Sequence, residues 1–365
     1  ISSGDSVDLR AQSDILDYFS DAAQPVVNIF TGNVGSNSGN VYLKTLTGDI
    51  GTSTNFVDVR IEQGDLDAEV DEDMFVNSVT DLNVGSVTST DGNITLIVDG
   101  VANVGVITAL GDGTFAQGSN GVVNINNDID GVVTIDAATN IVRYNDAGWN
   151  INANAAVLIA NYGIGDSNNP FETKVSRLEA EIPSGGIWLD NTGDLIIGDI
   201  SDVFGISALN TVDISAFSDI MINENIDTDV GPVLLDASEN IIVNAGILSG
   251  GGRVVLLAEN DVIFTASGYI DTELTTIDTD QAAVTITATT GGITMADVSY
   301  IDGTDGFVDI NATLDILLSH IRTTTQVDID SSTGNILDNG DSDLEVVAAK
   351  LQMSAQGNIG IDSDE

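Results

Sequence analysis

The sequence predicts an all-β protein built as a β-solenoid, in which the chain winds through stacked coils of short strands. Two patterns carry this prediction. Apolar residues alternate with other residues over short runs, and the same run recurs about every 21 to 25 residues. The composition agrees, because 42% of the residues are hydrophobic but only 5% are aromatic, so Val, Ile and Leu must fill the core. The 38 Gly residues suit many tight turns.

The clearest copies of the repeat lie between Gly185 and Phe264. Each copy places two apolar residues and one small residue at alternate positions, followed by a polar pair and a second apolar pair. The triplets are Ile187, Leu189 and Asn191; Val212, Ile214 and Ala216; Val233, Leu235 and Ala237; and Val254, Leu256 and Ala258. The second pairs begin at Leu195, Ile220, Ile241 and Val262. This spacing predicts two strands separated by a bend, each with one face directed inward.

The same pattern extends from Gly39 to the end of the chain, so we expect one continuous solenoid over residues 39–365. Residues 1–38 are less regular and are interpreted as a lead-in or as the first coil. We expect roughly 15 to 17 coils of about 20–25 residues. The chain begins at Ile1 without an initiator Met or a signal peptide, which predicts a processed product or a piece of a longer protein.

A longer repeat is superimposed on the coils. Residues 159–198 resemble residues 47–85, and a third copy opens near the end of the chain. The matching Ile-Gly pairs are Ile50 and Gly51, Ile164 and Gly165, and Ile359 and Gly360. In the two longer copies a charged stretch departs from the coil pattern, near residues 55–74 and 168–184, and we interpret both stretches as flap-like insertions. Because the last coil has no atypical capping sequence, we expect either that the segment belongs to a larger solenoid or that its end stacks on another copy.

The charge is strongly negative. With 9 Lys and Arg against 57 Asp and Glu, the formal net charge is -48, which excludes nucleic acid as a partner. No apolar run is long enough for membrane insertion. The acidic residues gather in turn-like strings, where Asp is a good turn former but also a calcium ligand. The residues considered as Ca²⁺ ligands are Asp302, Asp305, Asp338, Asp341 and Asp343. Bound Ca²⁺ is the one cofactor that the sequence suggests.

Catalytic motifs are missing, so we do not expect an enzyme. The chain has a single histidine, His320, and no Cys, which leaves too few ligands for a transition-metal site. His320 and Arg322 lie two residues apart and therefore share a face on a strand, with Asp315 and Asp328 near in sequence. This set is the best candidate for a catalytic patch, and an incidental ion pair is the alternative.

Aromatic residues gather around the second long repeat: Tyr144, Trp149, Tyr162, Phe171 and Trp188. They fit either a platform on which sugars stack or side chains that pack an irregular loop onto the coils, and packing is the commoner role of a Trp beside a loop.

The coil pattern, and above all the segment GIGDSNNPFETKVSRLEAEIPSGGIWLDNTGDLIIG, resembles the repeat regions of very large bacterial surface and secreted proteins of the filamentous haemagglutinin type. The resemblance covers nearly everything from Gly39 onward. It implies a right-handed parallel β-helix that serves as the shaft of an extracellular or cell-surface adhesin or filament. The secretion domain expected in such proteins is not evident in residues 1–40.

The sequence therefore predicts a structural repeat protein, an adhesin shaft or filament subunit that Ca²⁺ stiffens, located outside the cell or on its surface. Self-association and surface glycans are the partners expected. The alternative is a β-helix that binds carbohydrate or degrades polysaccharide. That alternative requires a groove lined by aromatic residues and carboxylates on consecutive coils.

Overall fold

The computed structural model describes residues 1–3, 6–17, 27–32, 39–111, 131–145, 148–201, 203, 205–273, 282–340 and 344–360. These residues form strands and no helix, and strands of successive coils pair in parallel, so the predicted all-β solenoid is confirmed. The chain divides into two compact units, which are described separately. Unit 1 comprises Ile1–Pro183 and Ile200–Val203, and unit 2 comprises Ser184–Asp199 and Phe204–Glu365.

In unit 1 the strands belong to two sheets. The first contains β1 (Ser2–Ser3), β3 (Ile29–Thr31), β5 (Val57–Ile61), β7 (Met74–Ser78), β9 (Ile94–Val98), β11 (Val132–Ala137), β14 (Ala155–Ala160) and β17 (Arg177–Ile182). The second contains β2 (Val7–Ala11), β4 (Val41–Thr45), β6 (Asp65–Val70), β8 (Leu82–Ser89), β10 (Ala102–Ala109), β12 (Asn140–Arg143), β13 (Ile151–Ala153), β15 (Gly163–Ile164) and β16 (Phe171–Lys174). Since β2 pairs with β4, residues 7–11 already belong to the first coil.

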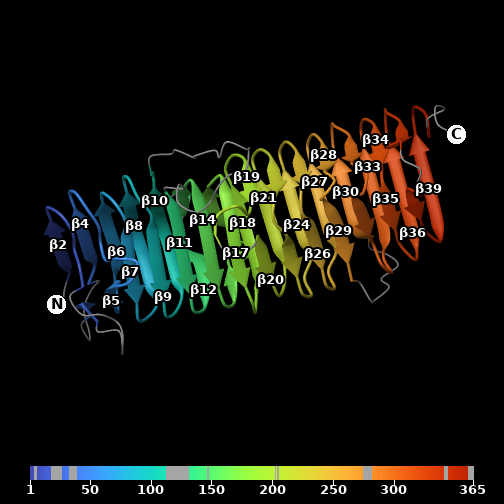
Figure 1. The fold of residues 1–365 in the computed structure, drawn as a ribbon. Coiled ribbons are helices and arrows are strands. Elements are labelled where there is room, and N and C mark those ends of the chain that lie inside the picture. Colours follow the sequence, from blue (N-terminus) through green and yellow to red (C-terminus); the bar gives the residue numbers. More distant parts are fainter. Residues whose placement is uncertain are drawn as a thin grey trace. The chain divides into compact units, whose positions relative to one another are not determined.

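In unit 2 each coil contributes one long strand and two short ones, which form three columns (Figure 1). The long column is β18 (Gly186–Asn191), β21 (Val212–Ala216), β24 (Val233–Ala237), β27 (Val254–Ala258), β30 (Ala282–Ala288), β33 (Phe307–Ala312), β36 (Gln326–Ser331) and β39 (Lys350–Ala355). The first short column is β19 (Leu195–Ile197), β22 (Ile220–Ile222), β25 (Ile241–Val243), β28 (Val262–Phe264), β31 (Ile293–Met295), β34 (Ile316–Leu318) and β37 (Ile336–Asp338). The second short column is β20 (Ile206–Ala208), β23 (Ile226–Thr228), β26 (Gly246–Ser249), β29 (Tyr269–Thr272), β32 (Tyr300–Asp302), β35 (His320–Arg322) and β38 (Val346–Val347).

The predicted triplets form the core of the long column. Val212 pairs with Val233 and Val233 with Val254, so identical positions stack from coil to coil. Ile214 and Leu256 in the same column are fully buried. Burial of such a side chain stabilises the fold by about 1.5–3 kcal/mol, so the stacked positions carry much of the stability of each coil.

Two details of the prediction are wrong. The second short strand of each coil was not foreseen, because it holds a single inward apolar residue, such as Ile226 or Ile247, and one residue shows no periodicity. Coil length also varies more than expected. Leu66 pairs with Val84, 18 residues later, whereas Val254 pairs with Val284, 30 residues later. The difference lies outside the paired strands, so the stacking of the strands is kept.

The two expected flaps are ordinary parts of the solenoid. The stretch near residues 55–74 contains β5 and β6, which pair with β7 and β8. The stretch near residues 168–184 contains β16 and β17, which pair with β13 and β14. In β6 charged residues alternate with buried apolar ones such as Ala68, whereas in β17 Arg177 and Glu179 are themselves buried beside Ala180.

The long repeat is visible as a shared turn. Gly51, Gly165 and Gly360 all have positive φ, at 73°, 62° and 81°. Each donates its N–H to a carbonyl one coil earlier, namely that of Ile15 (2.8 Å), Ile141 (2.9 Å) and Ile336 (2.8 Å). Only Gly adopts this backbone conformation without strain, which explains why the Ile-Gly pair recurs.

Candidate functional site

Many acidic residues lie at the corner before the first short strand of a coil, where each binds the next coil. In unit 2, Oδ1 of Asp219 accepts hydrogen bonds from the backbone N–H of Asn240 (2.9 Å) and from its Nδ2 (2.8 Å). Oδ1 of Asn240 accepts the N–H of Asp261 (3.1 Å), and Oδ1 of Asp261 accepts that of Gly292 (2.7 Å). We call this series of side-chain bonds between coils a corner ladder.

Unit 1 contains a corner ladder of the same kind. Oδ1 of Asp14, Asp49 and Asp73 accepts the backbone N–H of Asp49 (3.0 Å), Asp73 (2.9 Å) and Asn93 (2.8 Å), respectively. The ladders satisfy backbone donors at a bend, and they tie each coil to its neighbour. Much of the Asp in the turns therefore has a structural role.

The Asp residues considered as Ca²⁺ ligands make separate local contacts. Oδ1 of Asp302, Asp305 and Asp338 accepts a hydrogen bond from the Thr304 N–H (2.9 Å), the Thr324 hydroxyl (2.8 Å) and the Gly340 N–H (2.7 Å), respectively. Asp341 and Asp343 lie outside the described residues. Within the described ranges, no three His, Cys, Asp or Glu side chains come close enough to hold a metal ion. Calcium binding at these residues remains a prediction.

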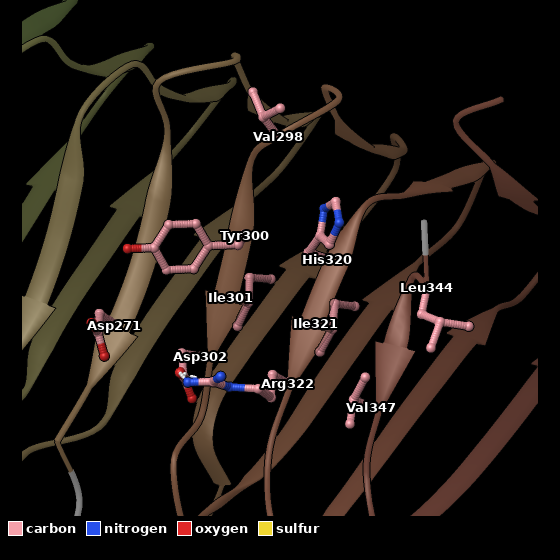
Figure 2. A pocket seen from close by; sticks show the side chains of 10 residues that line it. All are labelled: Asp271, Val298, Tyr300, Ile301, Asp302, His320, Ile321, Arg322, Leu344 and Val347. Carbon is pink, nitrogen blue, oxygen red and sulfur yellow. Dashed lines mark hydrogen bonds and ion pairs between the residues drawn. The ribbon is translucent and has the colours of Figure 1, made fainter. Parts of the chain in front are cut away.

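A cavity of about 590 Å³ opens on the second short column of unit 2, over β29, β32 and β35 (Figure 2). Alternation along these strands of three or four residues explains its position. The middle residues, Ile270, Ile301 and Ile321, point into the core and are almost fully buried. The residues on either side of them therefore point outward, and those of β32 and β35 line the cavity.

The strand register arranges these outward residues in two rows. Tyr269 pairs with Tyr300 and Tyr300 with His320, which gives an aromatic row across three coils. Asp271 pairs with Asp302 and Asp302 with Arg322, which gives a charged row beside it.

The aromatic row contains a stacked pair of rings. The centroids of Tyr269 and Tyr300 are 4.9 Å apart, and the ring planes differ by 13°. Tyr269 lies over Gly246 of the preceding coil, where a Cβ atom would come within 2.4 Å of its Cζ. Gly246 thus makes room for Tyr269, and Tyr269 supports Tyr300, whose ring lines the cavity. Burial, with smaller contributions from Asp271, Tyr269 and Asp302, raises the pKa of Tyr300, so its hydroxyl stays protonated at neutral pH.

The charged row contains an ion pair. Nε of Arg322 donates to Oδ2 of Asp302 at 3.1 Å, and Nη2 donates to the same oxygen. The Asp302 side chain is only 16% exposed, whereas that of Arg322 is 73% exposed. Burial raises the pKa of Asp271, as do the charges of Asp302 and Glu273, while Arg322 lowers it. The row therefore combines a fixed carboxylate with an exposed guanidinium.

Besides Ile301 and Ile321, three more apolar side chains line the cavity: Val298, Leu344 and Val347. All three are well exposed, Leu344 most of all at 74%. Val298 also has a φ of 66°, in the left-handed region that a β-branched residue rarely adopts. The cavity thus has one aromatic side, one charged side and an apolar edge (Figure 2).

The sequence located part of this site. His320 and Arg322 lie on one face as predicted, but Asp315 and Asp328 do not join them. Oδ1 of Asp315 accepts the N–H of Asn335 at 2.8 Å, and Asp328 lies on β36 in the long column. Asp271, Asp302 and the two Tyr residues take their place. The signal that could have revealed them is the repeated tripeptide Tyr-Ile-Asp at positions 269 and 300.

The other predicted aromatic cluster shows contacts typical of packing. Phe171 is fully buried in the core of unit 1. Nζ of Lys174 lies 4.7 Å from the ring centroid of Trp149, and the Tyr144 hydroxyl donates to Asp65 at 3.1 Å. Tyr162 is exposed, and Trp188 lies on β18, in unit 2. These contacts favour the packing interpretation for Trp149 and Phe171.

Comparison with protein-family models, curated proteins and solved structures gives no match to the chain. The part of the chain that the structure describes contains no helix that is long and apolar enough to cross a membrane. The strand pairing shows a β-solenoid repeat fold. The resemblance to filamentous haemagglutinin-like proteins rests on the sequence pattern alone.

Proposed function

We propose that this chain is a structural segment, the shaft of an extracellular or cell-surface adhesin or a subunit of an extracellular filament, without a catalytic role. The observation that carries the proposal is the coil-to-coil bonding in each unit, where strand pairing and corner ladders repeat along the chain. Repeats of this kind contact only their neighbours, so a load is distributed over many similar steps.

End-to-end self-association, or association with neighbouring segments of the same protein, is part of the proposal, and β39 is the strand at which it can be tested. Leu351 pairs with Val327, which is fully buried, yet Leu351 itself is 47% exposed. A second copy or a neighbouring segment of the same protein, stacked on β39, would bury Leu351 in the way that the coils bury Val327. This contact is the basis of the end-to-end self-association that we propose.

Calcium has a supporting role in this proposal. Burial, followed by the charges of Asp190 and Asp236 on adjacent coils, raises the pKa of Asp213. Neighbouring carboxylates that repel one another destabilise a shaft with a net charge of -48, and Ca²⁺ relieves that repulsion. The proposal therefore includes stiffening by divalent cations.

Negative-stain electron microscopy of the purified chain with Ca²⁺ and then with chelator tests the proposal. We expect fibres with Ca²⁺ that shorten in chelator. The variant Leu351→Lys is expected to block fibre growth, because it places a charge on the stacking surface. The control Leu257→Lys changes a partly exposed residue within the long column and is expected to leave the fibres intact. Single particles of constant size under all conditions would contradict self-association.

Antibody labelling of intact cells that produce the protein tests the location. We expect labelling without permeabilisation. Labelling that requires permeabilised cells would contradict a surface or extracellular role.

A further inference from the structure

We propose that the cavity over β29, β32 and β35 binds a neutral pyranose sugar of an oligosaccharide, with its C–H face on the Tyr300 ring and its hydroxyl groups on the Asp302–Arg322 pair. This inference is independent of the shaft proposal. It requires only the geometry of the second short column, and it assigns to the surface of unit 2 a ligand site that a purely mechanical role does not need.

The Tyr300 ring on the aromatic side of the cavity is held in place by its neighbours. Tyr300 stacks on Tyr269, and Tyr269 occupies the space left by the missing side chain of Gly246. A ring that is held from behind loses little conformational entropy when a ligand stacks on its other face. Of the two stacked rings, it is that of Tyr300 that lines the cavity. A pyranose presents an apolar C–H face that suits an aromatic ring.

The charged row supplies groups that recognise hydroxyls. Asp302 is held by Arg322 and by the Thr304 N–H, so its orientation is fixed before a ligand arrives. A guanidinium has five N–H donors, and the bonds to Asp302 use Nε and Nη2. The side chain of Arg322 is 73% exposed, so among the described residues its other donors remain accessible to a ligand. A fixed acceptor beside exposed donors matches adjacent hydroxyl groups, each of which can donate and accept.

The charged groups that line the cavity favour a neutral ligand over an anion or a cation. A polyanionic glycan would be repelled by a chain with a net charge of -48, and Asp271 and Asp302 line the same cavity. A cation would be attracted to a tyrosine face, but here the guanidinium of Arg322 also lines the cavity. The volume of about 590 Å³ lies within the range of about 300–1,000 Å³ that is typical of small-molecule sites.

Strain at the cavity edge agrees with a binding role. Val298 holds a φ of 66° two residues before β32 begins, although Gly or Asn would adopt this conformation at lower cost. Its side chain is 61% exposed and lines the cavity, so the strain is not compensated by burial in the core. An apolar contact with a ligand gives the exposed Val298 side chain a role.

Titration calorimetry of the full chain with neutral gluco-, galacto-, manno- and xylo-hexaoses tests the proposal, with a heparin hexasaccharide and tetramethylammonium as charged probes. We expect at least one neutral hexaose to bind. Tyr300→Ala is expected to weaken binding at least tenfold, Tyr300→Phe to retain it, and Arg322→Gln to weaken it several-fold. Tyr162→Ala, which changes an exposed Tyr in unit 1, is the matched control and is expected to bind like the parent chain.

Thermal unfolding of every variant separates loss of the site from loss of the fold. The Arg322→Gln variant keeps the test decisive if the Ala variant proves unstable, because unchanged binding by folded Arg322→Gln would then overturn the proposal. Absence of binding by all four neutral hexaoses up to 10 mM overturns the proposal. Binding that Tyr300→Ala does not weaken in a folded protein overturns it as well. Binding of the heparin probe or of tetramethylammonium alone also overturns it, because the site would then recognise charge.

Discussion

At the scale of single residues, the solenoid tolerates few unfavourable backbone conformations, and Val298 is the clearest of them. Among the described residues other than Gly, only Val298, Asp199 and Thr304 have positive φ; Val298 and Thr304 are β-branched, and Val298 is the apolar one. A strained residue of this kind costs about 1–3 kcal/mol, and its persistence points to a role outside stability.

The substitution Val298→Gly is therefore expected to raise the free energy of unfolding by about 1 kcal/mol, because Gly removes the strain. At Val230, which is also exposed but has no positive φ, the same change to Gly is expected to lower the free energy of unfolding by about 0.5–1 kcal/mol. Chemical denaturation measures both values. Equal destabilisation by the two substitutions would contradict the assignment of strain to Val298.

At the scale of the element, each corner works as a link between coils. The ladder residue Asp219 receives two hydrogen bonds from Asn240, one from the backbone and one from the side chain. The oxygen atom matters more than the charge in this position, since Asn240 itself serves as the acceptor one coil later.

Asp219→Ala is expected to lower the free energy of unfolding by about 1–2 kcal/mol, because it leaves the Asn240 N–H without its acceptor. Asp219→Asn keeps an acceptor oxygen and is expected to cost less than half as much. Urea denaturation provides the measurement, and Asp91→Ala at an exposed turn serves as the control. If Asn proved as costly as Ala, the charge and not the ladder bond would be the stabilising feature.

The Ile-Gly turn offers a second test at this scale. Gly51 and Gly360 have similar positive φ angles, but a Cβ on Gly51 would lie 2.4 Å from the Phe75 carbonyl oxygen, whereas one on Gly360 meets nothing within 4 Å. Gly360→Ala is expected to cost about 1 kcal/mol from backbone strain alone. Gly51→Ala is expected to cost clearly more, and thermal unfolding of both variants gives the comparison. Equal costs would show that the contact with Phe75 relaxes freely.

At the scale of the whole molecule, negative charge dominates. Burial is the main cause that raises the pKa of carboxyl groups on several strands, and nearby carboxylates add to it in most of them: Asp136, Asp213, Asp227, Asp236, Asp271 and Asp309. For Glu72 the charge of Asp49 is the largest cause. The hydrogen bond from Arg10 lowers the pKa of the exposed Asp8 carboxyl group. The pKa of a minority of carboxyl groups is therefore shifted downward.

These shifts fix the sign of the pH dependence. A carboxyl group with a raised pKa binds its proton more tightly in the folded state than in the unfolded chain. As the pH falls from 7 toward about 4, the folded state takes up protons first, so its stability increases. We expect the melting temperature to be higher at pH 5 than at pH 7, and added salt to reduce the difference. A melting temperature that falls steadily over this range would contradict the expectation.

The sequence predicts the parts of the fold that repeat within one coil. The inward triplets, such as Val233, Leu235 and Ala237, follow from alternation alone. The cavity could not be predicted, because Tyr269, Tyr300 and His320 meet only through a register that spans coils of unequal length, 31 and 20 residues apart. Hydrogen-bonded ladders of Asn side chains can be expected in a solenoid, but their Asp members cannot be identified from the sequence, since a turn Asp looks the same whether its carboxylate faces water or the next coil.

The corner ladders have a consequence for how such a chain can be altered. Each ladder bond joins equivalent positions of neighbouring coils and is indifferent to the number of residues between them, as the 21 residues from Asp219 to Asn240 and the 31 from Asp261 to Gly292 show. Alignment is thus restored wherever a ladder bond joins two coils, so an added or deleted loop segment there does not propagate an error to the next coil. A foreign peptide grafted between β26 and β27, at residues 250–252, would be displayed at a fixed height in unit 2, with the coils on either side still aligned.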